Sequence, residues 1–155
     1  MSALVAYFSA SGVTEKVAER LAAAINAPVY EIKPAVPYTP ADLDWTKKTS
    51  RSSIEMNDKA SRPALADKTA PVADADVIYI GYPVWWYREP SIIDSFVEAY
   101  DFKGKSIALF ATSGSSDIGR EAGTRIEALT GAKVIKAKRF ASAVSAEALK
   151  AWAEE

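Results

Sequence analysis

Residues 3–14 read Ala-Leu-Val-Ala-Tyr-Phe-Ser-Ala-Ser-Gly-Val-Thr, a continuous apolar run that ends in a polar turn. An apolar run without alternation is typical of a strand buried on both faces of a parallel sheet. Beyond the turn, apolar residues recur at helical spacing, namely Val17, Leu21, Ala24 and Ile25. The opening of the chain therefore predicts a buried strand, a turn and an amphipathic helix.

The same alternation of strand and helix continues along the chain. Strand patterns occupy residues 28–32, 77–81, 106–111 and 134–135, and helical patterns occupy residues 90–100, 118–129 and 145–152. Strands that alternate with helices predict a parallel sheet covered on both faces, because parallel neighbours are joined by right-handed crossovers. We therefore expect a doubly wound α/β/α sandwich around a five-stranded parallel sheet of order 2-1-3-4-5, with its ligand crevice at the carboxyl ends of the first and third strands.

An irregular insert of about residues 34–75 separates the second and third strand patterns. It is longer than a crossover needs, and it holds five of the eight prolines. The residues Thr39-Pro40-Ala41-Asp42 have the pattern of a helix start, and residues 50–59 favour a short helix. Two interpretations stay open for this insert, a solvated crossover and a lid or wall of a binding site.

Composition excludes several classes of protein. The 155 residues, with 49% apolar and 25% charged side chains, predict one globular domain over residues 1–155. The chain has no Cys and no His, which excludes disulfides, His-ligated metals and Ser-His-Asp triads, so we assign no metal site and no catalytic residue. A net charge of -1 argues against nucleic-acid and anionic-membrane partners. Without a signal-peptide pattern or an apolar run of about 20 residues, a cytoplasmic protein is expected.

The turn at residues 9–14 carries three hydroxyl groups and one glycine between a buried strand and a helix. Such a turn directs N–H groups and hydroxyls at one spot before the positive end of the helix dipole, which suits a phosphate. It is neither a Walker loop nor a GxGxxG turn, because it has a single glycine and no Gly-Lys-Ser/Thr. The same residues are also compatible with a Ser/Thr-rich turn that caps its own helix.

Three consecutive aromatic residues lie in the segment Pro83-Val84-Trp85-Trp86-Tyr87, directly after the strand pattern at residues 77–81. They cannot all face the core, so at least one is expected to be exposed or to cover a ligand. Planar rings are suited to stacking on a flat conjugated heterocycle. Packing of these rings against a neighbouring helix or a partner subunit is the alternative.

A third polar loop, Thr112-Ser113-Gly114-Ser115-Ser116-Asp117, follows the next strand pattern. Its small residues allow close approach of the backbone to a ligand, and its hydroxyls are hydrogen-bond donors. The three loops converge because the carboxyl ends of parallel strands meet at one edge of the sheet. A hydroxyl cradle, an aromatic wall and a polar backbone rim fit a phosphorylated planar cofactor, and FMN fits best.

These loops resemble those of the flavodoxin superfamily, and the resemblance covers nearly the whole chain. Residues 9–14 are similar to the family's phosphate loop, while residues 81–86 and 111–115 resemble the two loops that contact the flavin ring in a short bacterial branch related to NAD(P)H quinone reductases. The resemblance implies FMN bound by Ser9, Ala10, Ser11, Gly12, Val13, Thr14, Pro83, Val84, Trp85, Trp86, Tyr87, Thr112, Ser113, Gly114 and Ser115.

The sequence also departs from that branch. Tyr87 and Ser115 stand where glycine is common, and no further glycine follows Gly81 in its loop. Tyr38 and the Arg62-Pro63 pair resemble the branch but have no assigned role.

Three functions remain open at this point. The chain is either an FMN-containing electron carrier that exchanges with redox partner proteins, an FMN-dependent oxidoreductase that takes hydride from NAD(P)H to a quinone or similar small-molecule acceptor, or a cofactor-free binding module. Carrier flavodoxins tend to be strongly acidic, so the net charge of -1 keeps the reductase open. Tyr38, Tyr82 and Tyr87 are possible proton donors to a reduced quinone, although packing roles are favoured. Donor, acceptor and oligomeric state are not determined by the sequence.

Overall fold

The computed structural model describes residues 2–86, 88–113 and 122–155. The predictions made for Tyr87, Gly114 and Ser115, and for the start of the helix expected at residues 118–129, lie outside these residues.

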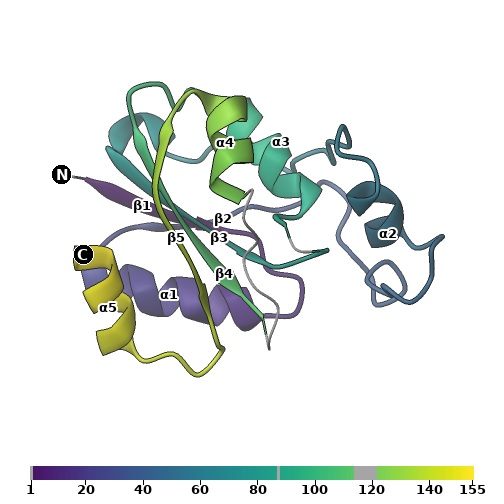
Figure 1. Ribbon diagram of the computed structural model, residues 1–155, viewed down its shortest axis with the longest axis horizontal. Coiled ribbons are helices and arrows are strands. Elements are labelled where there is room, and N and C mark those ends of the chain that lie inside the picture. The colour runs from purple at the N-terminus through teal and green to yellow at the C-terminus, as the bar shows by residue number, and fades with distance from the viewer. Residues whose placement is uncertain (1, 87, 114–121) are drawn as a thin grey trace.

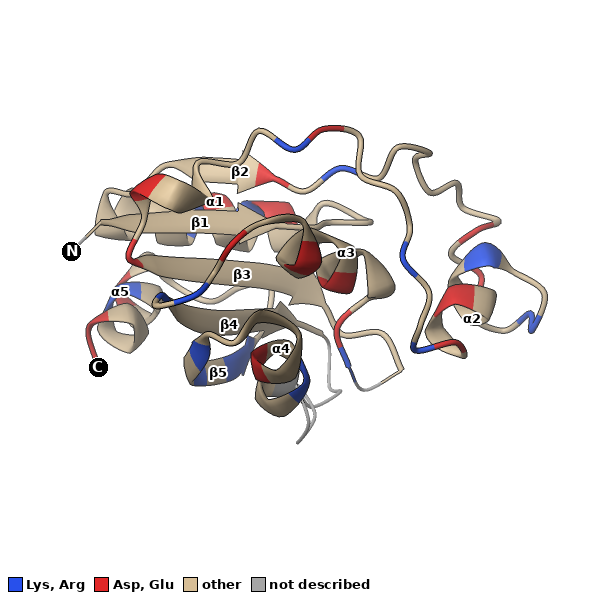
Figure 2. Cartoon of the chain, turned by 90° about the horizontal axis from the view of Figure 1, so that it is seen from above, with Lys and Arg blue, Asp and Glu red and all other residues tan. Residues whose placement is uncertain are grey.

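The predicted parallel sheet is confirmed. Its strands are β1 (Ala3–Tyr7), β2 (Val29–Glu31), β3 (Val77–Pro83), β4 (Ser106–Thr112) and β5 (Lys133–Phe140). They are arranged in the order β2-β1-β3-β4-β5, and every neighbouring pair is parallel (Figure 2). The order reverses between β1 and β3, so a crevice is expected where these two strands end.

Helices cover both faces of this sheet. The helices α3 (Ser91–Ala99) and α4 (Ala122–Thr130) lie over one face, and α1 (Val13–Ile25) and α5 (Ala146–Glu154) lie over the other (Figure 1). The short helix α2 (Arg51–Met56) lies apart from both layers, beyond the end of the sheet where β3 and β4 finish. Among the described residues, no helix has the length and apolar character needed to cross a bilayer.

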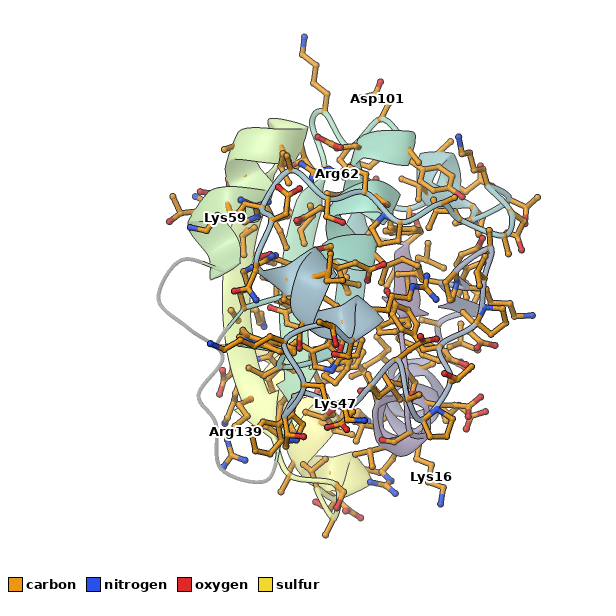
Figure 3. The ribbon with its side chains drawn as sticks, turned by 90° about the vertical axis from the view of Figure 1, so that its right-hand side faces the viewer. Lys16, Lys47, Lys59, Arg62, Asp101 and Arg139 are labelled. Atoms are coloured by element: carbon orange, nitrogen blue, oxygen red, sulfur yellow. The ribbon has the colours of Figure 1, made fainter. Side chains whose placement is uncertain are left out.

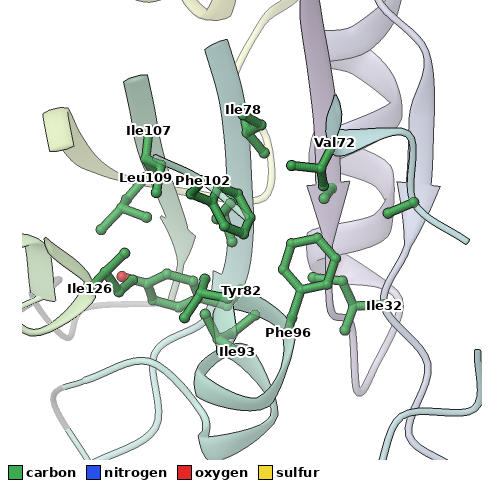
Figure 4. Packing of buried hydrophobic residues seen from close by; sticks show 14 of the residues in the cluster. Ile32, Val72, Ile78, Tyr82, Ile93, Phe96, Phe102, Ile107, Leu109 and Ile126 are labelled. Carbon is green, nitrogen blue, oxygen red and sulfur yellow. The ribbon is translucent and has the colours of Figure 1, made fainter. Parts of the chain in front are cut away.

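The core consists of two clusters, one on each face of the sheet. Successive side chains of β3 alternate between them, because neighbouring residues of a strand point to opposite faces. Ile78, Ile80 and Tyr82 pack under α3 and α4 (Figure 4), whereas Val77 and Tyr79 pack on the side of α1 and α5. This two-sided burial explains why the strand patterns are continuous apolar runs.

The last strand is longer than the sequence pattern indicated. The expectation of a strand at residues 134–135 was wrong in extent, because β5 runs over Lys133–Phe140 and pairs with β4 from Ser106 to Thr112. Its sequence carries Lys133, Lys136 and Lys138, which interrupt the apolar pattern. Lysines on an edge strand discourage pairing with other chains, and the basic residues of β5 are blue in Figure 2.

The insert contains turns, the short helix α2 and a 3-10 helix over Val72–Asp74. The helix expected to begin at Thr39 is instead one turn, in which the Asp42 N–H donates to the Thr39 hydroxyl over 3.2 Å and the Thr39 N–H donates to the Asp42 carboxylate over 2.9 Å. The helical pattern stops because Asp44 accepts a hydrogen bond of 3.1 Å from the Thr46 N–H, which forms a competing turn. The helix expected within residues 50–59 is present as α2, capped by Ser50.

Candidate functional site

Two adjoining crevices lie at the carboxyl ends of β1, β3 and β4, the end of the molecule that faces the viewer in Figure 3. The first, the sheet crevice, has a volume of about 630 Å³ and is lined by Ser11, Val13, Pro83, Val84, Trp85, Thr112, Ser113, Ala141 and Ser142. The second, the insert crevice, has a volume of about 750 Å³ and is lined by Ala10, Ser11, Leu43, Trp45, Ser52, Pro83, Val84, Trp85 and Trp86. Both volumes are within the range usual for small-molecule sites.

The turn before α1 is shaped by Gly12. This residue has φ 91° and ψ -10°, a left-handed conformation that glycine adopts without a steric penalty. Its N–H donates to the Ser9 hydroxyl over 3.0 Å, and Gly12, as the N-cap residue, makes no side-chain hydrogen bond to the first turn of α1. The N-cap residue thus leaves the N–H groups at the positive end of this helix for an anion, while the Ser9 hydroxyl closes the turn before the helix.

Two of the candidate hydroxyls bond to each other. Thr14 and Thr112 are both buried, and their Oγ1 atoms are 2.7 Å apart although the residues are 98 positions apart in the chain. This hydrogen bond joins the first turn of α1 to the end of β4. Thr14 does not line the sheet crevice, and its bond to Thr112 fixes the turn at residues 9–14 to β4. Thr112 and Ser113 do line this crevice.

The aromatic loop is a tight turn with one strained residue. Trp85 and Arg88 exchange two backbone hydrogen bonds of 3.1 and 3.0 Å, and Trp86 between them has φ 48°. A bulky residue at positive φ costs free energy and tends to occur at functional sites. The Trp86 side chain lines the insert crevice and is 38% exposed. The sequence prediction that one ring of this loop is exposed is therefore confirmed.

The indole of Trp85 forms the wall that the two crevices share. It packs edge-on against Phe8 at 5.6 Å and against Tyr38 at 5.5 Å between ring centroids. The Arg51 guanidinium lies 3.9 Å from the Tyr38 ring, and the Tyr38 hydroxyl donates to Glu55. Burial and this bond raise the pKa of Tyr38, so it remains protonated. Through these contacts the insert supports the crevice wall.

A buried charge cluster lies directly behind the aromatic loop. Glu89 and Asp94 are fully buried. The Arg125 guanidinium lies 3.4 Å from Glu89 and 2.9 Å from Asp94, and Arg88 lies 3.7 Å from each carboxylate. Arg62, which had no role at the level of sequence, bonds Glu98 over 2.6 Å and lies 3.9 Å from Asp94. The cluster therefore joins the insert to α3 and α4.

The arginines of this cluster also bind backbone oxygens of the insert. Arg88 donates to the Met56 carbonyl over 3.0 Å, and Arg125 and Arg62 both donate to the Lys59 carbonyl, over 2.6 and 2.9 Å. Lys59 and Arg62 lie on the upper part of the face shown in Figure 3. The insert is thus fixed to the core by charge-assisted hydrogen bonds, which are among the stronger polar contacts in proteins.

Burial raises the pKa of Glu89 to about 8, and the like charge of Asp94 adds to this rise, which outweighs the attraction of Arg125 and Arg88. A carboxyl whose pKa is higher in the folded than in the unfolded chain favours folding when protonated. That contribution is complete below its ordinary pKa and is lost as the pH rises through about 8.

The free energy of unfolding of the wild type is therefore expected to fall between pH 5 and pH 9, and that of the Glu89→Gln variant to fall by less. The difference between the two changes should be on the order of 2 kcal/mol. Urea unfolding at the two pH values measures the difference. Glu98→Gln is the matched control, because Glu98 is 41% exposed and its pKa is lowered by Arg62. An equal pH dependence of wild type and Glu89→Gln would show that Glu89 is ionised throughout.

Comparison with known proteins places this chain in a family. A family model for flavodoxins matches residues 2–155. The chain belongs to the flavodoxin family. The predicted superfamily resemblance is therefore confirmed. No curated protein was found to match the chain.

Solved structures extend this relationship. A candidate flavoprotein from Bacteroides uniformis is 46% identical with a TM-score of 0.92, over 99% of this chain and 98% of that chain. A second, from Bacteroides eggerthii, is 43% identical with a TM-score of 0.91, over 99% and 96% of the two chains. A Lactobacillus acidophilus flavoprotein in complex with FMN is 24% identical with a TM-score of 0.70, over 89% of this chain and 92% of that chain, which shows the same fold.

The sequence predicted most of the residues that line the two crevices of this flavodoxin, but not all of them. Of the described candidate residues, Ala10, Ser11, Val13, Pro83, Val84, Trp85, Trp86, Thr112 and Ser113 line one or both crevices. Leu43, Trp45 and Ser52 of the insert, and Ala141 and Ser142 after β5, were not predicted. Trp45 was the only one with a sequence signal, an indole in an otherwise polar segment.

Proposed function

We propose that this flavodoxin binds FMN in the sheet crevice and acts as a redox protein. The observation that carries the proposal is the uncapped first turn of α1 at one end of the crevice, next to the indole wall of Trp85. A phosphate needs N–H donors and positive potential, whereas a flavin ring needs an apolar planar surface. The crevice offers both within one cavity. The FMN complex of the Lactobacillus acidophilus flavoprotein supports the same choice of cofactor.

The residues of the crevice fit the parts of FMN. The N–H groups at the start of α1 and the exposed Ser11 hydroxyl would hold the phosphate, with Gly12 leaving open space in front of the turn. Val84 and Trp85 would cover the ring and exclude water from it. When bound, FMN supplies the electron chemistry, so the protein needs no catalytic acid of its own.

Electron transfer is the function we infer for the bound cofactor. In the carrier version the partners are redox proteins, and in the reductase version they are NAD(P)H and a small acceptor. The insert crevice favours the reductase as a second candidate, because it provides room for a small molecule directly beside the sheet crevice. A carrier that meets only protein partners has no need of such a cavity.

A comparison of FMN with riboflavin tests the proposed cofactor. Riboflavin has the same ring system and lacks the phosphate, so the apoprotein is expected to bind it about 100-fold more weakly than FMN. Titration of apoprotein with each flavin, followed by flavin fluorescence, measures both dissociation constants. Equal affinity for the two flavins, or no binding of either, would remove the basis of the proposal.

The Trp85→Ala variant is expected to bind FMN more weakly by roughly 1–3 kcal/mol, because Trp85 lines the sheet crevice and the change removes a large ring from the proposed binding site. Trp86→Ala is the matched control, because Trp86 lines only the insert crevice, and it should bind FMN as the wild type does. Titration of each apoprotein with FMN measures the two dissociation constants. Wild-type FMN affinity in Trp85→Ala would show that this ring does not contact the cofactor.

A further inference from the structure

A positive charge lies next to the wall of the sheet crevice. The described residues that line this crevice are all uncharged. Arg139, near the end of β5, donates from Nη1 to the Ser113 carbonyl over 2.9 Å, and Ser113 is one of the lining residues. Arg139 is labelled at the lower left of the face shown in Figure 3. Its guanidinium is thus one contact away from any molecule that occupies the crevice beside Ser113.

The position of Arg139 follows from the register of the sheet. Arg139 pairs with Ala111 and Phe140 pairs with Thr112, so β5 ends beside the point where β4 gives way to Ser113. The Phe140 ring packs against Trp152 of α5. Because neighbouring residues of a strand point to opposite faces, the Arg139 side chain is directed to the other face of the sheet. The strand register therefore brings the guanidinium to the Ser113 carbonyl.

The charge of Arg139 is not neutralised by the part of the chain that the structure describes. The arginines of the insert and of the buried charge cluster each have a carboxylate oxygen within 4.0 Å. Arg139 forms no such ion pair within residues 2–86, 88–113 and 122–155, and it binds a carbonyl instead. A hydrogen bond to a carbonyl orients a guanidinium without cancelling its charge. The positive charge therefore acts on the contents of the crevice.

Arg139 is distant from the turn proposed to hold the phosphate. That turn leaves β1, and β5 lies three places from β1 in the sheet order. At about 4.8 Å between neighbouring strands, the two strands are about 14 Å apart. A ligand whose phosphate lies at the start of α1 and whose ring extends along the crevice would bring the ring, and not the phosphate, toward Ser113 and Arg139.

A fixed cation affects the two oxidation states of a flavin ring differently. The oxidised ring is uncharged, and reduction by two electrons with uptake of one proton leaves a ring with one negative charge. The attraction between opposite charges therefore stabilises only the reduced ring, and it is stronger where water is excluded. Val84 and Trp85 provide an apolar wall in the same crevice. Charge near the ring is one of the means by which a protein changes the electronic properties of its cofactor.

We propose that Arg139 raises the reduction potential of FMN in the sheet crevice by holding a positive charge beside the ring through its bond to the Ser113 carbonyl. The inference rests on the proposed function, since it requires FMN in this crevice. Arg139 acts on the cofactor through space and is not a catalytic residue. It makes the bound flavin a better acceptor of electrons from a reductant.

The test compares the affinities of one protein for oxidised and for reduced FMN. Apoprotein is titrated with oxidised FMN, and the midpoint potential of FMN-loaded protein is measured by anaerobic reduction with dithionite in the presence of a reference dye. Because binding and reduction form a closed thermodynamic cycle, these values give the affinity for reduced FMN. Wild-type protein that does not bind FMN would refute the proposed function, and the inference with it.

Arg139→Gln removes the charge and keeps a hydrogen-bond donor. We expect its affinity for oxidised FMN to stay within about twofold of the wild type, and its affinity for reduced FMN to fall about tenfold. A tenfold change lowers a two-electron midpoint potential by about 30 mV. Arg139→Met, a second variant without the charge, should show the same shift, whereas Arg139→Lys should keep most of the wild-type potential.

Lys133→Gln is the matched control, because it removes one positive charge from the opposite end of the same strand. Lys133 is exposed, and at about 3.3 Å per residue it lies about 20 Å from Arg139. Exposed charges at that distance are largely screened at 0.1 M salt, where the Debye length is about 10 Å. The control should therefore have the wild-type potential.

Three results would overturn the inference while the proposed function stands. The first is a wild-type potential in Arg139→Gln or Arg139→Met. The second is an equal shift in Lys133→Gln, which would make the effect one of net charge. The third is a loss of affinity for oxidised FMN in Arg139→Gln without a loss for riboflavin, which would place the guanidinium on the phosphate.

Discussion

A variant with Gly12→Asp is expected to purify without flavin. The position that a Cβ of residue 12 would occupy has no atom within 4 Å, so the new side chain fits without a clash and the chain should fold. It would project from the turn at the positive end of α1, where the phosphate is proposed to bind. A carboxylate there occupies the phosphate site and repels its charge, so FMN affinity should fall by more than about 1000-fold.

The measurement is the flavin content of the purified variant, followed by titration with added FMN. Gly12→Asn is the matched control, since asparagine has nearly the same size and the same strain at φ 91° but no charge. We expect it to bind FMN more weakly than the wild type and far better than the aspartate variant. A full complement of flavin in Gly12→Asp would mean that the phosphate does not lie at this turn.

The sheet order of this flavodoxin followed from local sequence patterns. The runs at residues 3–8, 77–81 and 106–111 are apolar without alternation, because each strand is covered on both faces. Such runs, separated by helical patterns, allow few topologies. The loops that leave these strands could therefore be assigned to one edge of the sheet from sequence alone.

Contacts between distant parts of the chain were not predictable in the same way. Thr14 was expected to face the ligand, but its hydroxyl bonds Thr112, a partner 98 residues away that no local pattern reveals. Glu89 follows Arg88 in the sequence and has the local appearance of a solvated charged pair. It is fully buried only because α3, α4 and the insert close around it.

The position of the insert was also not predictable from local sequence patterns. Its prolines and turn residues predicted irregular structure, and both a solvated crossover and a binding-site wall were compatible with that pattern. The choice depends on where the segment docks. Arg88 and Arg125, which bind its Met56 and Lys59 carbonyls, come from elements far along the chain. Docking through these bonds brings Leu43, Trp45 and Ser52 to the crevice.

Replacement of Gly81 by alanine is expected to destabilise the fold by about 3 kcal/mol or more. Gly81 lies in β3 between Tyr7 of β1 and Phe110 of β4, and the Phe110 ring lies directly over its Cα. A Cβ at this position would lie 2.1 Å from Phe110 Cζ, far inside van der Waals contact. Phe110 is fully buried, so the ring cannot move away without disturbing its neighbours. Urea unfolding of the apoprotein measures the loss.

The double variant Gly81→Ala with Phe110→Leu distinguishes a steric clash from a general intolerance of the strand to substitution. Leucine lacks the ring atoms closest to the new Cβ, so the double variant should be more stable than the sum of the two single effects predicts. Gly123→Ala is the control, because among the described residues its Cβ would meet only Val134, at 3.3 Å. If Gly81→Ala is as stable as the wild type, the approach of the ring to β3 is not as close as described. If it is unstable but the two effects are additive, Phe110 is not the obstacle. The clash predicts strong coupling between Gly81 and Phe110, and Gly81 lies two residues before Pro83, where the chain enters the crevice wall.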